Sequence, residues 1–78
     1  MTQRTLTYYG KLAELTGKPK EEITTEANTV GTLKDRLIDR YPALKKVSFK
    51  LAQGQAIADD KDLLTDTNID VFPPFSGG

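Results

Sequence analysis

Alternating apolar and polar residues predict a β-strand near the start of the chain, followed by a short helix. Residues 5–9 (TLTYY) alternate and are rich in β-branched and aromatic side chains, which places Leu6 and Tyr8 on one face of a strand. Residues 11–16 carry leucines three positions apart, as one face of a helix requires. Gly17 follows where a C-cap glycine ends a helix. The pattern therefore predicts a strand and then a helix.

The middle of the chain predicts an edge strand and the main helix. Residues 21–26 have one strong apolar position, Ile23, which favours an edge strand or a sheet with one solvent-exposed face. We expect this strand to pair with the first one as a hairpin around the short helix. Thr29 is a good N-cap for a helix over 30–41, which Pro42 stops because the residue before a proline disfavours helical backbone. The apolar positions of this helix form one stripe of Leu33, Leu37, Ile38 and Tyr41.

The last third of the chain predicts short strands. Residues 47–52 alternate again, and a glycine-containing turn separates them from a short returning strand over 56–58. We expect Leu63 and Leu64 to fill the core. A final strand follows over 69–72, with apolar residues at every second position.

This order of elements predicts a single α+β domain with the β-grasp arrangement. A mixed sheet would pack one face on the stripe of the main helix. We expect the domain to occupy residues 1–75, with a flexible C-terminal Gly-Gly tail over 76–78.

The composition removes several classes of chemistry. The 78 residues include no cysteine and no histidine, which excludes disulfides, thiol nucleophiles, serine–histidine triads and most zinc sites. Eleven basic residues balance eleven acidic ones, which argues against nucleic-acid or anionic-membrane binding. The only hint of a basic patch is Lys45, Lys46 and Lys50, interpreted as solvated surface. We expect no metal site, no signal peptide and a cytoplasmic location.

The residues after the last strand have an unusual composition. Pro73 and Pro74 cannot donate to a strand ladder, and they favour an extended arm. Ser76, Gly77 and Gly78 follow, and glycine can enter a channel too narrow for any side chain. The end of this thread is the α-carboxylate of Gly78. A partner holding ATP can convert that carboxylate to an acyl-adenylate, from which a sulfur nucleophile displaces AMP and leaves a thiocarboxylate.

At these residues the chain resembles a known family. The sequence FPPFSGG at 72–78 is similar to the C-terminal signature of molybdopterin synthase small subunits, ubiquitin-like sulfur carriers of the MoaD and ThiS group. The resemblance extends over YYGKLAELTGK at 8–18, TVGTLKDRLIDRYP at 29–42 and LAQGQAIADDKDLLTDTNIDVFPP at 51–74. The family usually has an acidic residue where this chain has Thr32.

The resemblance implies a carrier whose partners perform the catalysis. Gly78 would be adenylated by an E1-like, MoeB-like enzyme and then thiocarboxylated. The tail would enter the active site of a MoaE-like large subunit and donate sulfur to a cyclic pterin precursor, building the dithiolene that holds molybdenum. ATP and magnesium belong to the activating partner, and no cofactor is bound by this chain alone. The implied assembly is a heterotetramer around a large-subunit dimer.

The residues before the glycines are the predicted partner-binding segment: Phe72, Pro73, Pro74 and Phe75. If Ile69 and Val71 face the core, alternation points Phe72 outward, where it would dock a partner. The alternative is that Phe72 folds back over the sheet.

Three other functions remain open at this point. The chain can carry sulfur for thiamine or tRNA thiolation, although the FPP signature argues against this. It can be a protein modifier that forms an isopeptide bond between Gly78 and a lysine. It can also be a plain binding module with an inert tail.

Overall fold

The computed structural model describes residues 2–54 and 56–73, and these form the predicted α+β fold. The elements in chain order are β1 (Thr2–Tyr8), α1 (Lys11–Thr16), β2 (Lys20–Thr25), α2 (Val30–Arg40), the 3-10 helix η1 (Pro42–Lys46), β3 (Lys50–Gln53), β4 (Ala56–Ala58) and β5 (Asn68–Phe72). The predicted boundary between a domain over 1–75 and a tail over 76–78 lies outside the described residues and stays a prediction.

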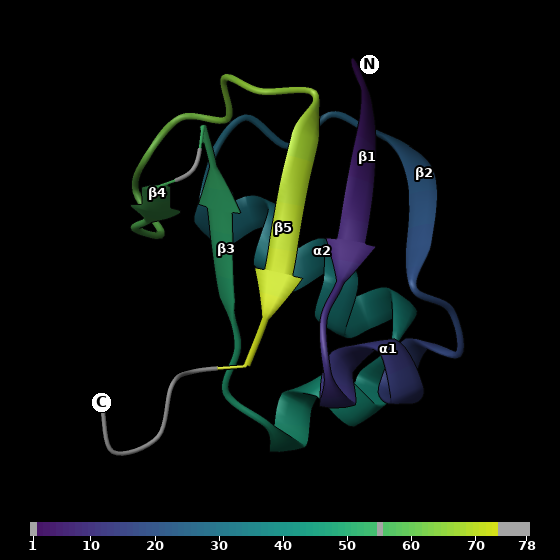
Figure 1. The fold of residues 1–78 in the computed structure, drawn as a ribbon. Coiled ribbons are helices and arrows are strands. Elements are labelled where there is room, and N and C mark those ends of the chain that lie inside the picture. Colours follow the sequence, from purple (N-terminus) through teal and green to yellow (C-terminus); the bar gives the residue numbers. More distant parts are fainter. Residues whose placement is uncertain (1, 55, 74–78) are drawn as a thin grey trace.

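One mixed sheet of five strands has the order β2-β1-β5-β3-β4, so the last strand of the chain lies in the middle (Figure 1). β5 runs parallel to β1, and the other three pairings are antiparallel. β2 is an edge strand, one of the two interpretations of the single apolar position at Ile23. It pairs with β1 in the expected hairpin around α1. This is the β-grasp topology.

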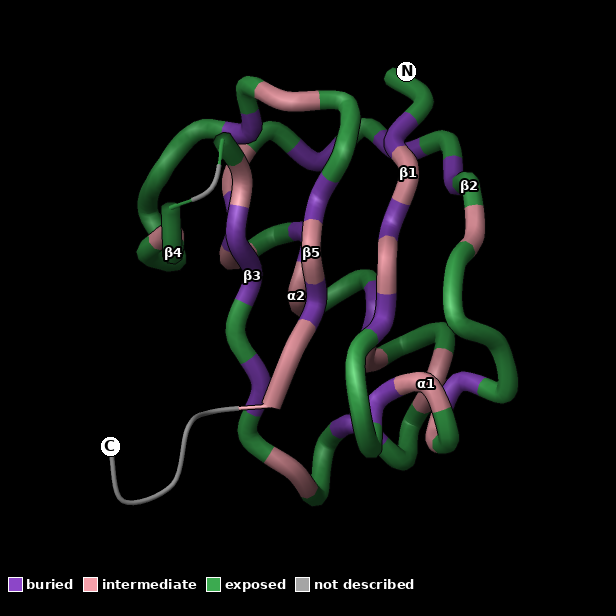
Figure 2. The backbone as a smooth tube through the Cα atoms, viewed as in Figure 1, coloured by how far each residue is buried: buried purple, intermediate pink, exposed green. Residues whose placement is uncertain are grey.

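The core lies between the sheet and α2. Figure 2 shows buried and partly exposed positions alternating along β1 and β5. α2 adds the predicted stripe, with Leu33 and Leu37 fully buried and Ile38 and Tyr41 partly buried against the same cluster. The largest fully buried side chains are Leu6, Leu12, Leu33, Leu37, Leu44, Leu51, Ile69, Val30 and Val71.

Both predicted helix caps are confirmed. The Thr29 hydroxyl accepts a hydrogen bond from the Thr32 backbone N–H at 3.2 Å, and the two threonine hydroxyls lie 2.9 Å apart. Thr32 therefore contacts the cap through its own hydroxyl, at the position where the family usually has an acidic residue. Gly17 ends α1 with a left-handed φ of 81°.

The segment after Tyr41 differs from the prediction. Residues 47–49 are not in a strand, and β3 begins only at Lys50. Before it, Pro42 opens η1 at a position where the missing N–H costs nothing, and Leu44 inserts fully into the core. Of the two leucines expected in the core, Leu64 is buried, but Leu63 is 65% exposed.

Backbone hydrogen bonds join the loop between β4 and β5 to the start of α2. The backbone N–H of Val30 donates to the Asp62 carbonyl at 2.9 Å, and that of Gly31 donates to the Asp60 carbonyl at 2.7 Å. A Cβ at position 31 would lie 3.0 Å from the Asp60 oxygen, so glycine allows this close approach. Two of the helix's free N–H groups are satisfied in this way.

No helix within 2–54 and 56–73 has the length and apolar character needed to cross a membrane. The cytoplasmic location stays a prediction.

Candidate functional site

The base of the predicted tail is anchored at the centre of the sheet. β5 is hydrogen-bonded on one side to β1, in register Leu6 to Ile69 and Tyr8 to Val71, and on the other side to β3. Ile69 and Val71 are 1% and 0% exposed. The chain therefore leaves the domain from a strand that is paired along both edges and fixed to the core.

The turn between β1 and α1 lies beside the point where the chain leaves β5. Gly10 has a φ of 56° and a ψ of −131°, a conformation that side-chain-bearing residues rarely adopt. A Cβ at Gly10 would lie 3.8 Å from Cγ of Pro73, and the backbone N–H of Tyr9 donates to the Val71 carbonyl at 2.9 Å. The turn is thus hydrogen-bonded to the last buried residue of β5 and lies beside the first proline.

The face of the sheet opposite α2 combines apolar side chains with a few polar ones. In Figure 1, α2 lies behind the sheet and leaves the near face uncovered by that helix. A row in register crosses this face through Lys20, Thr7, Asp70, Ala52 and Ile57. Tyr9 and Ile57 are 48% and 57% exposed. We call the set Tyr9, Ala52, Ile57 and Phe72 the outer-face patch.

Phe72 lies at the end of β5 in register with Lys50 of β3. It is half-buried and alternates with the buried Val71, as the pattern predicted. The Phe72 side chain lies at the edge of the outer face and is neither fully exposed nor fully buried. Its role in binding a partner stays a prediction.

Of the seven predicted site residues, the structure describes Phe72 and Pro73. Pro74, Phe75, Ser76, Gly77 and Gly78 lie outside the described residues, and their roles stay predictions. Within the described ranges, no group of three histidine, cysteine, aspartate or glutamate residues is placed to hold a metal ion.

A tyrosine–carboxylate pair on the outer face was not predicted. The Tyr9 hydroxyl donates to Oδ1 of Asp70 at 3.3 Å. The Asp70 charge, with smaller contributions from desolvation and the hydrogen bond, raises the pKa of Tyr9. The pair lies directly beside the base of the tail, since Asp70 is two residues before Phe72. Strand alternation places Asp70 outward, but nothing local indicates that Tyr9 reaches it.

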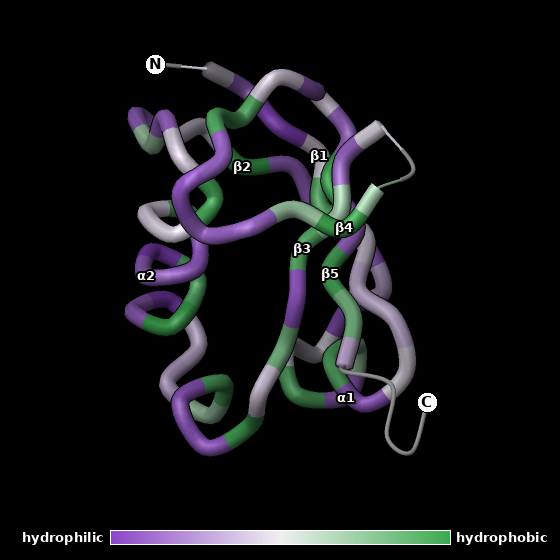
Figure 3. Tube along the Cα trace, turned by 90° about the vertical axis from the view of Figure 1, so that its left-hand side faces the viewer, coloured by the Kyte–Doolittle hydropathy of each residue, from purple (hydrophilic) through white to green (hydrophobic). Residues whose placement is uncertain are grey.

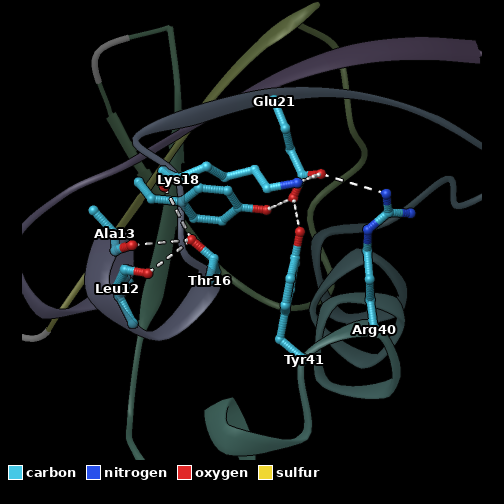
Figure 4. Close-up of polar contacts among 8 residues, drawn as sticks. Leu12, Ala13, Thr16, Lys18, Glu21, Arg40 and Tyr41 are labelled. Atoms are coloured by element: carbon cyan, nitrogen blue, oxygen red, sulfur yellow. Dashed lines mark hydrogen bonds and ion pairs between the residues drawn. The ribbon is translucent and has the colours of Figure 1, made fainter.

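A second tyrosine–carboxylate cluster lies on the opposite face, between β2 and the end of α2 (Figure 4). Glu21 is the acceptor at its centre, with a side chain 7% exposed. The hydroxyls of Tyr8 and Tyr41 donate to its Oε2 at 2.5 and 2.6 Å. Arg40 and Lys18 form ion pairs with its Oε1 at 3.4 and 3.6 Å. We call these five residues the Glu21 cluster.

The cluster shifts the titration of its members in opposite directions. Burial opposes ionisation of Glu21, but the hydrogen bonds from Tyr41 and Tyr8 and the charges of Arg40 and Lys18 outweigh it and lower its pKa. Burial, the hydrogen bond to Glu21 and the Glu21 charge raise the pKa of Tyr8 far above the ordinary value. The cluster is therefore most stable with Glu21 ionised and Tyr8 neutral.

The Glu21 cluster connects three elements near the base of the tail. Tyr8 ends β1 and is in register with Val71, Glu21 belongs to β2, and Arg40 ends α2. The rings of Tyr8 and Tyr41 also meet edge to face, with centroids 6.3 Å apart. The arrangement fixes the end of β1 from which the Gly10 turn begins. The sequence indicated only that both tyrosines would lie in or around the core.

Comparisons with known proteins agree with this geometry. The sequence model that defines the ThiS family matches residues 6–78 of this chain. A protein described as a candidate molybdopterin converting factor, subunit 1, from Pyrococcus furiosus has a structure similar to this one, with a TM-score of 0.84 at 21% identity, covering 96% of this chain and all of that one.

Two structures of small archaeal modifier protein 1 are also similar. The Haloferax volcanii protein gives a TM-score of 0.77 at 21% identity and covers 99% of this chain and 100% of its own. The Methanosarcina acetivorans protein gives 0.68 at 25% identity and covers 100% of this chain and 98% of its own.

The family model covers nearly the whole chain, and the fold matches both kinds of ubiquitin-like protein. The chain belongs to the ThiS family and has the ubiquitin-like β-grasp fold of the MoaD and ThiS sulfur carriers.

Proposed function

We propose that this protein is the sulfur-carrying small subunit of molybdopterin synthase. One observation carries the proposal: the segment 72–78 (FPPFSGG) begins at the last residue of the central strand of a ThiS-family domain. The first two residues of that segment adjoin the Gly10 turn and the outer-face patch. In this proposal the folded domain carries, after its central strand, a narrow C-terminal segment that ends in two glycines.

The proposed chemistry takes place on the α-carboxylate of Gly78. A carboxylate oxygen attacks the α-phosphate of ATP held with magnesium by an E1-like partner, and pyrophosphate leaves. A sulfur nucleophile then attacks the acyl carbon, AMP leaves, and the product is a thiocarboxylate. This chain contributes the carboxylate and the narrow thread, whereas its partners contribute the acid–base groups that a chain without histidine or cysteine lacks.

In this proposal the thread then enters the large subunit, which performs the transfer to the pterin precursor. Pro73 and Pro74 limit the flexibility of the segment, and Phe72 and Phe75 contact the partner. The outer-face patch is the docking surface, because aromatic and aliphatic side chains at the centre of an interface supply most of its binding free energy. The assembly is a heterotetramer around a large-subunit dimer.

The first test is intact mass spectrometry after incubation with a matched E1-like enzyme, Mg-ATP and a sulfide source. We expect a mass change of one oxygen replaced by one sulfur, localised to Gly78 by fragmentation. A variant lacking Gly78 is the control: it should fold normally and show no change. An unchanged mass in the full chain, with an activating enzyme that forms the adenylate of a known carrier, would contradict the proposal.

Protein modification is the second candidate, and the match to the Methanosarcina acetivorans modifier protein favours it. It uses the same activated Gly78 but transfers the acyl group to a lysine amine instead of accepting sulfur. Expression of the tagged chain in its own host separates the two functions. Lysine-linked conjugates that disappear when Gly78 is deleted would establish the modifier role, and a thiocarboxylate without conjugates would support the sulfur carrier.

A further inference from the structure

A groove with an apolar floor and a basic rim lies between α2 and the start of β3, with its floor on the helix side of the sheet. It has a volume of about 310 Å³ and is bounded by α2, η1 and the start of β3. Figure 3 views the molecule from the side on which α2 and β3 flank this region. The residues that matter for its chemistry are Ile38, Val47, Phe49, Lys34, Lys45 and Lys50.

The floor of the groove is continuous with the core. Ile38 and Val47 are partly buried and pack against the core cluster, and Phe49 beneath them is 5% exposed. These side chains are therefore held in place, and the groove presents aliphatic surface to solvent. One apolar side chain of a partner can cover that surface, because the volume is at the small end of the range for binding pockets.

The charged residues on the rim of the groove are all basic, and one of them has an acidic partner. All three of its charged lining residues are lysines, and the chain has no acidic residue anywhere from position 41 to position 58. Lys34 pairs with Asp60 at 3.1 Å and lies 5.5 Å from the Phe49 ring centroid. Among the residues that the structure describes, Lys45 and Lys50 have no carboxylate within ion-pair distance.

The contrast with the neighbouring hollow shows that this basic rim is local. That hollow, of about 470 Å³, is also lined by three lysines, Lys34, Lys50 and Lys61, but Asp59 and Asp60 lie in it as well. The whole chain has no net charge. An anionic partner is therefore attracted to the groove and not to the protein surface as a whole.

We propose that this groove binds an acidic segment of a protein partner, with one large apolar side chain seated on Ile38 and Val47 and aspartate or glutamate residues facing Lys45 and Lys50. The shape of the groove argues against the other anionic partners. A duplex needs a wider basic surface, and a single strand is usually bound by stacking on exposed aromatic rings, whereas Phe49 is buried. A concave floor does not insert into a lipid surface. The apolar floor of the groove lies on the helix side of the sheet, and its rim reaches the base of the tail at Lys50, which is in register with Phe72.

The chain offers a matched pair of variants. Lys45 and Lys46 are adjacent exposed lysines in η1, but only Lys45 lines the groove. Lys45→Glu reverses one charge on the rim, and Lys46→Glu makes the same chemical change outside it. Both positions are exposed, so both variants should fold. Lys50 is less suitable because it is in register with Phe72 at the base of the tail.

The test is a titration of the ¹⁵N-labelled full chain with a capped peptide that has a central leucine between pairs of aspartates. We expect chemical-shift changes centred on Ile38, Val47 and Phe49 and a dissociation constant that rises with salt. Lys45→Glu should weaken binding about three- to ten-fold, and Lys46→Glu less than about two-fold. A peptide with a central alanine should bind more weakly than the leucine peptide.

Several outcomes would overturn the proposal. The first is an absence of shift changes at millimolar peptide. The second is a set of changes centred on Tyr9 and Ile57, which would place the peptide on the outer face. The third is equal weakening by the two lysine variants. The fourth is tighter binding at the groove by a single-stranded oligonucleotide or by vesicles of anionic lipid, each measured in the same titration. None of these readouts depends on the chemistry of Gly78.

Discussion

Tyr8 and Tyr9 are neighbours in the sequence, and each donates a hydroxyl hydrogen bond to a carboxylate, yet the two pairs are physically different. Tyr8 is 3% exposed and lies 2.5 Å from Glu21, which also accepts from Tyr41 and pairs with two cations. Tyr9 is 48% exposed and lies 3.3 Å from Asp70. Tyr8 is the last residue of β1 and faces the core, whereas Tyr9 is the first residue after the strand and lies on the surface.

The difference indicates which pair stabilises the domain and which is available to a partner. A buried hydrogen bond to a charged acceptor is costly to break, because the groups left behind have no water to replace it. An exposed pair exchanges with water at little cost. We therefore expect the Glu21 cluster to stabilise the folded domain and the Tyr9–Asp70 pair to contribute to partner binding. The following experiments test this comparison.

The largest effect should come from removing the shared acceptor. Glu21→Ala leaves two tyrosine hydroxyls with reduced access to water and without their partner, and we expect the free energy of unfolding to fall by about 2–4 kcal/mol. Urea unfolding followed by circular dichroism measures this. Asp70→Ala is the matched control on the outer face and should unfold at nearly the wild-type urea concentration. Equal losses for the two variants would contradict the comparison.

A smaller effect should separate the two tyrosines directly. Tyr8→Phe removes one hydrogen bond to an ionised carboxylate and should lower the free energy of unfolding by about 1.5–3 kcal/mol. Tyr9→Phe should leave the unfolding midpoint unchanged within error. Tyr9→Ala, which also removes the ring, should instead weaken binding to the partner of the outer-face patch. If Tyr9→Phe proves as destabilising as Tyr8→Phe, the exposed pair has a structural role.

Acid should weaken the domain through Glu21. Its pKa is lower in the folded chain than in the unfolded chain, so the unfolded chain takes up the proton first. The stability that Glu21 contributes is fully present above about pH 4.5, its ordinary pKa, and is lost as the pH falls through its folded pKa. Glu21→Gln should flatten this acid limb in unfolding curves measured across pH, whereas Tyr9→Phe should retain it. If the free energy of unfolding of Glu21→Gln fell with decreasing pH as steeply as that of the wild type, Glu21 would not be the cause of the acid sensitivity.

The last and smallest expected effect is the pH dependence that ionisation of Tyr8 adds, which is absent at neutral pH and develops only in alkali. Its pKa is raised in the folded chain, mainly by burial, so the folded chain holds the proton more tightly. This contribution is fully present below about pH 10, the ordinary tyrosine value, and is lost as the pH rises further. Tyrosinate absorbance should show one late-titrating tyrosine that disappears in Tyr8→Phe. If the late titration persists in Tyr8→Phe, another tyrosine is responsible.

The features that sequence alone predicted are those with local signals. The stripe of α2, the Thr29 cap and the Gly17 C-cap each depend on residues within one or two turns, and all are confirmed. Pro42 was interpreted only as a stop, because a proline that ends one helix and begins another gives the same local signal. Leu63 and Leu64 are chemically identical, and only the position of the loop on α2 decides which one is buried.

The candidate site was predictable in its chemistry but not in its surroundings. The FPPFSGG segment is contiguous in sequence, so its resemblance was visible without a fold. The Glu21 cluster brings together positions 8, 18, 21, 40 and 41, which meet only after β2 pairs with β1 and α2 crosses the sheet. The same holds for the position of the Gly10 turn beside Pro73, since no pattern along the chain relates the two residues.

The parallel pairing of β1 with β5 has a mechanical consequence. Thr2 and Asn68 begin these strands at one end of the sheet, and Tyr8 and Phe72 end them at the other. A pull on the chain beyond Pro73, with the domain held through β1, acts along the two strands and loads their hydrogen bonds together in shear instead of opening them one at a time. Strands loaded in this way resist separation because several hydrogen bonds must break at once. Under the proposed function, this geometry would protect the fold when the segment after Pro73 is withdrawn from a partner.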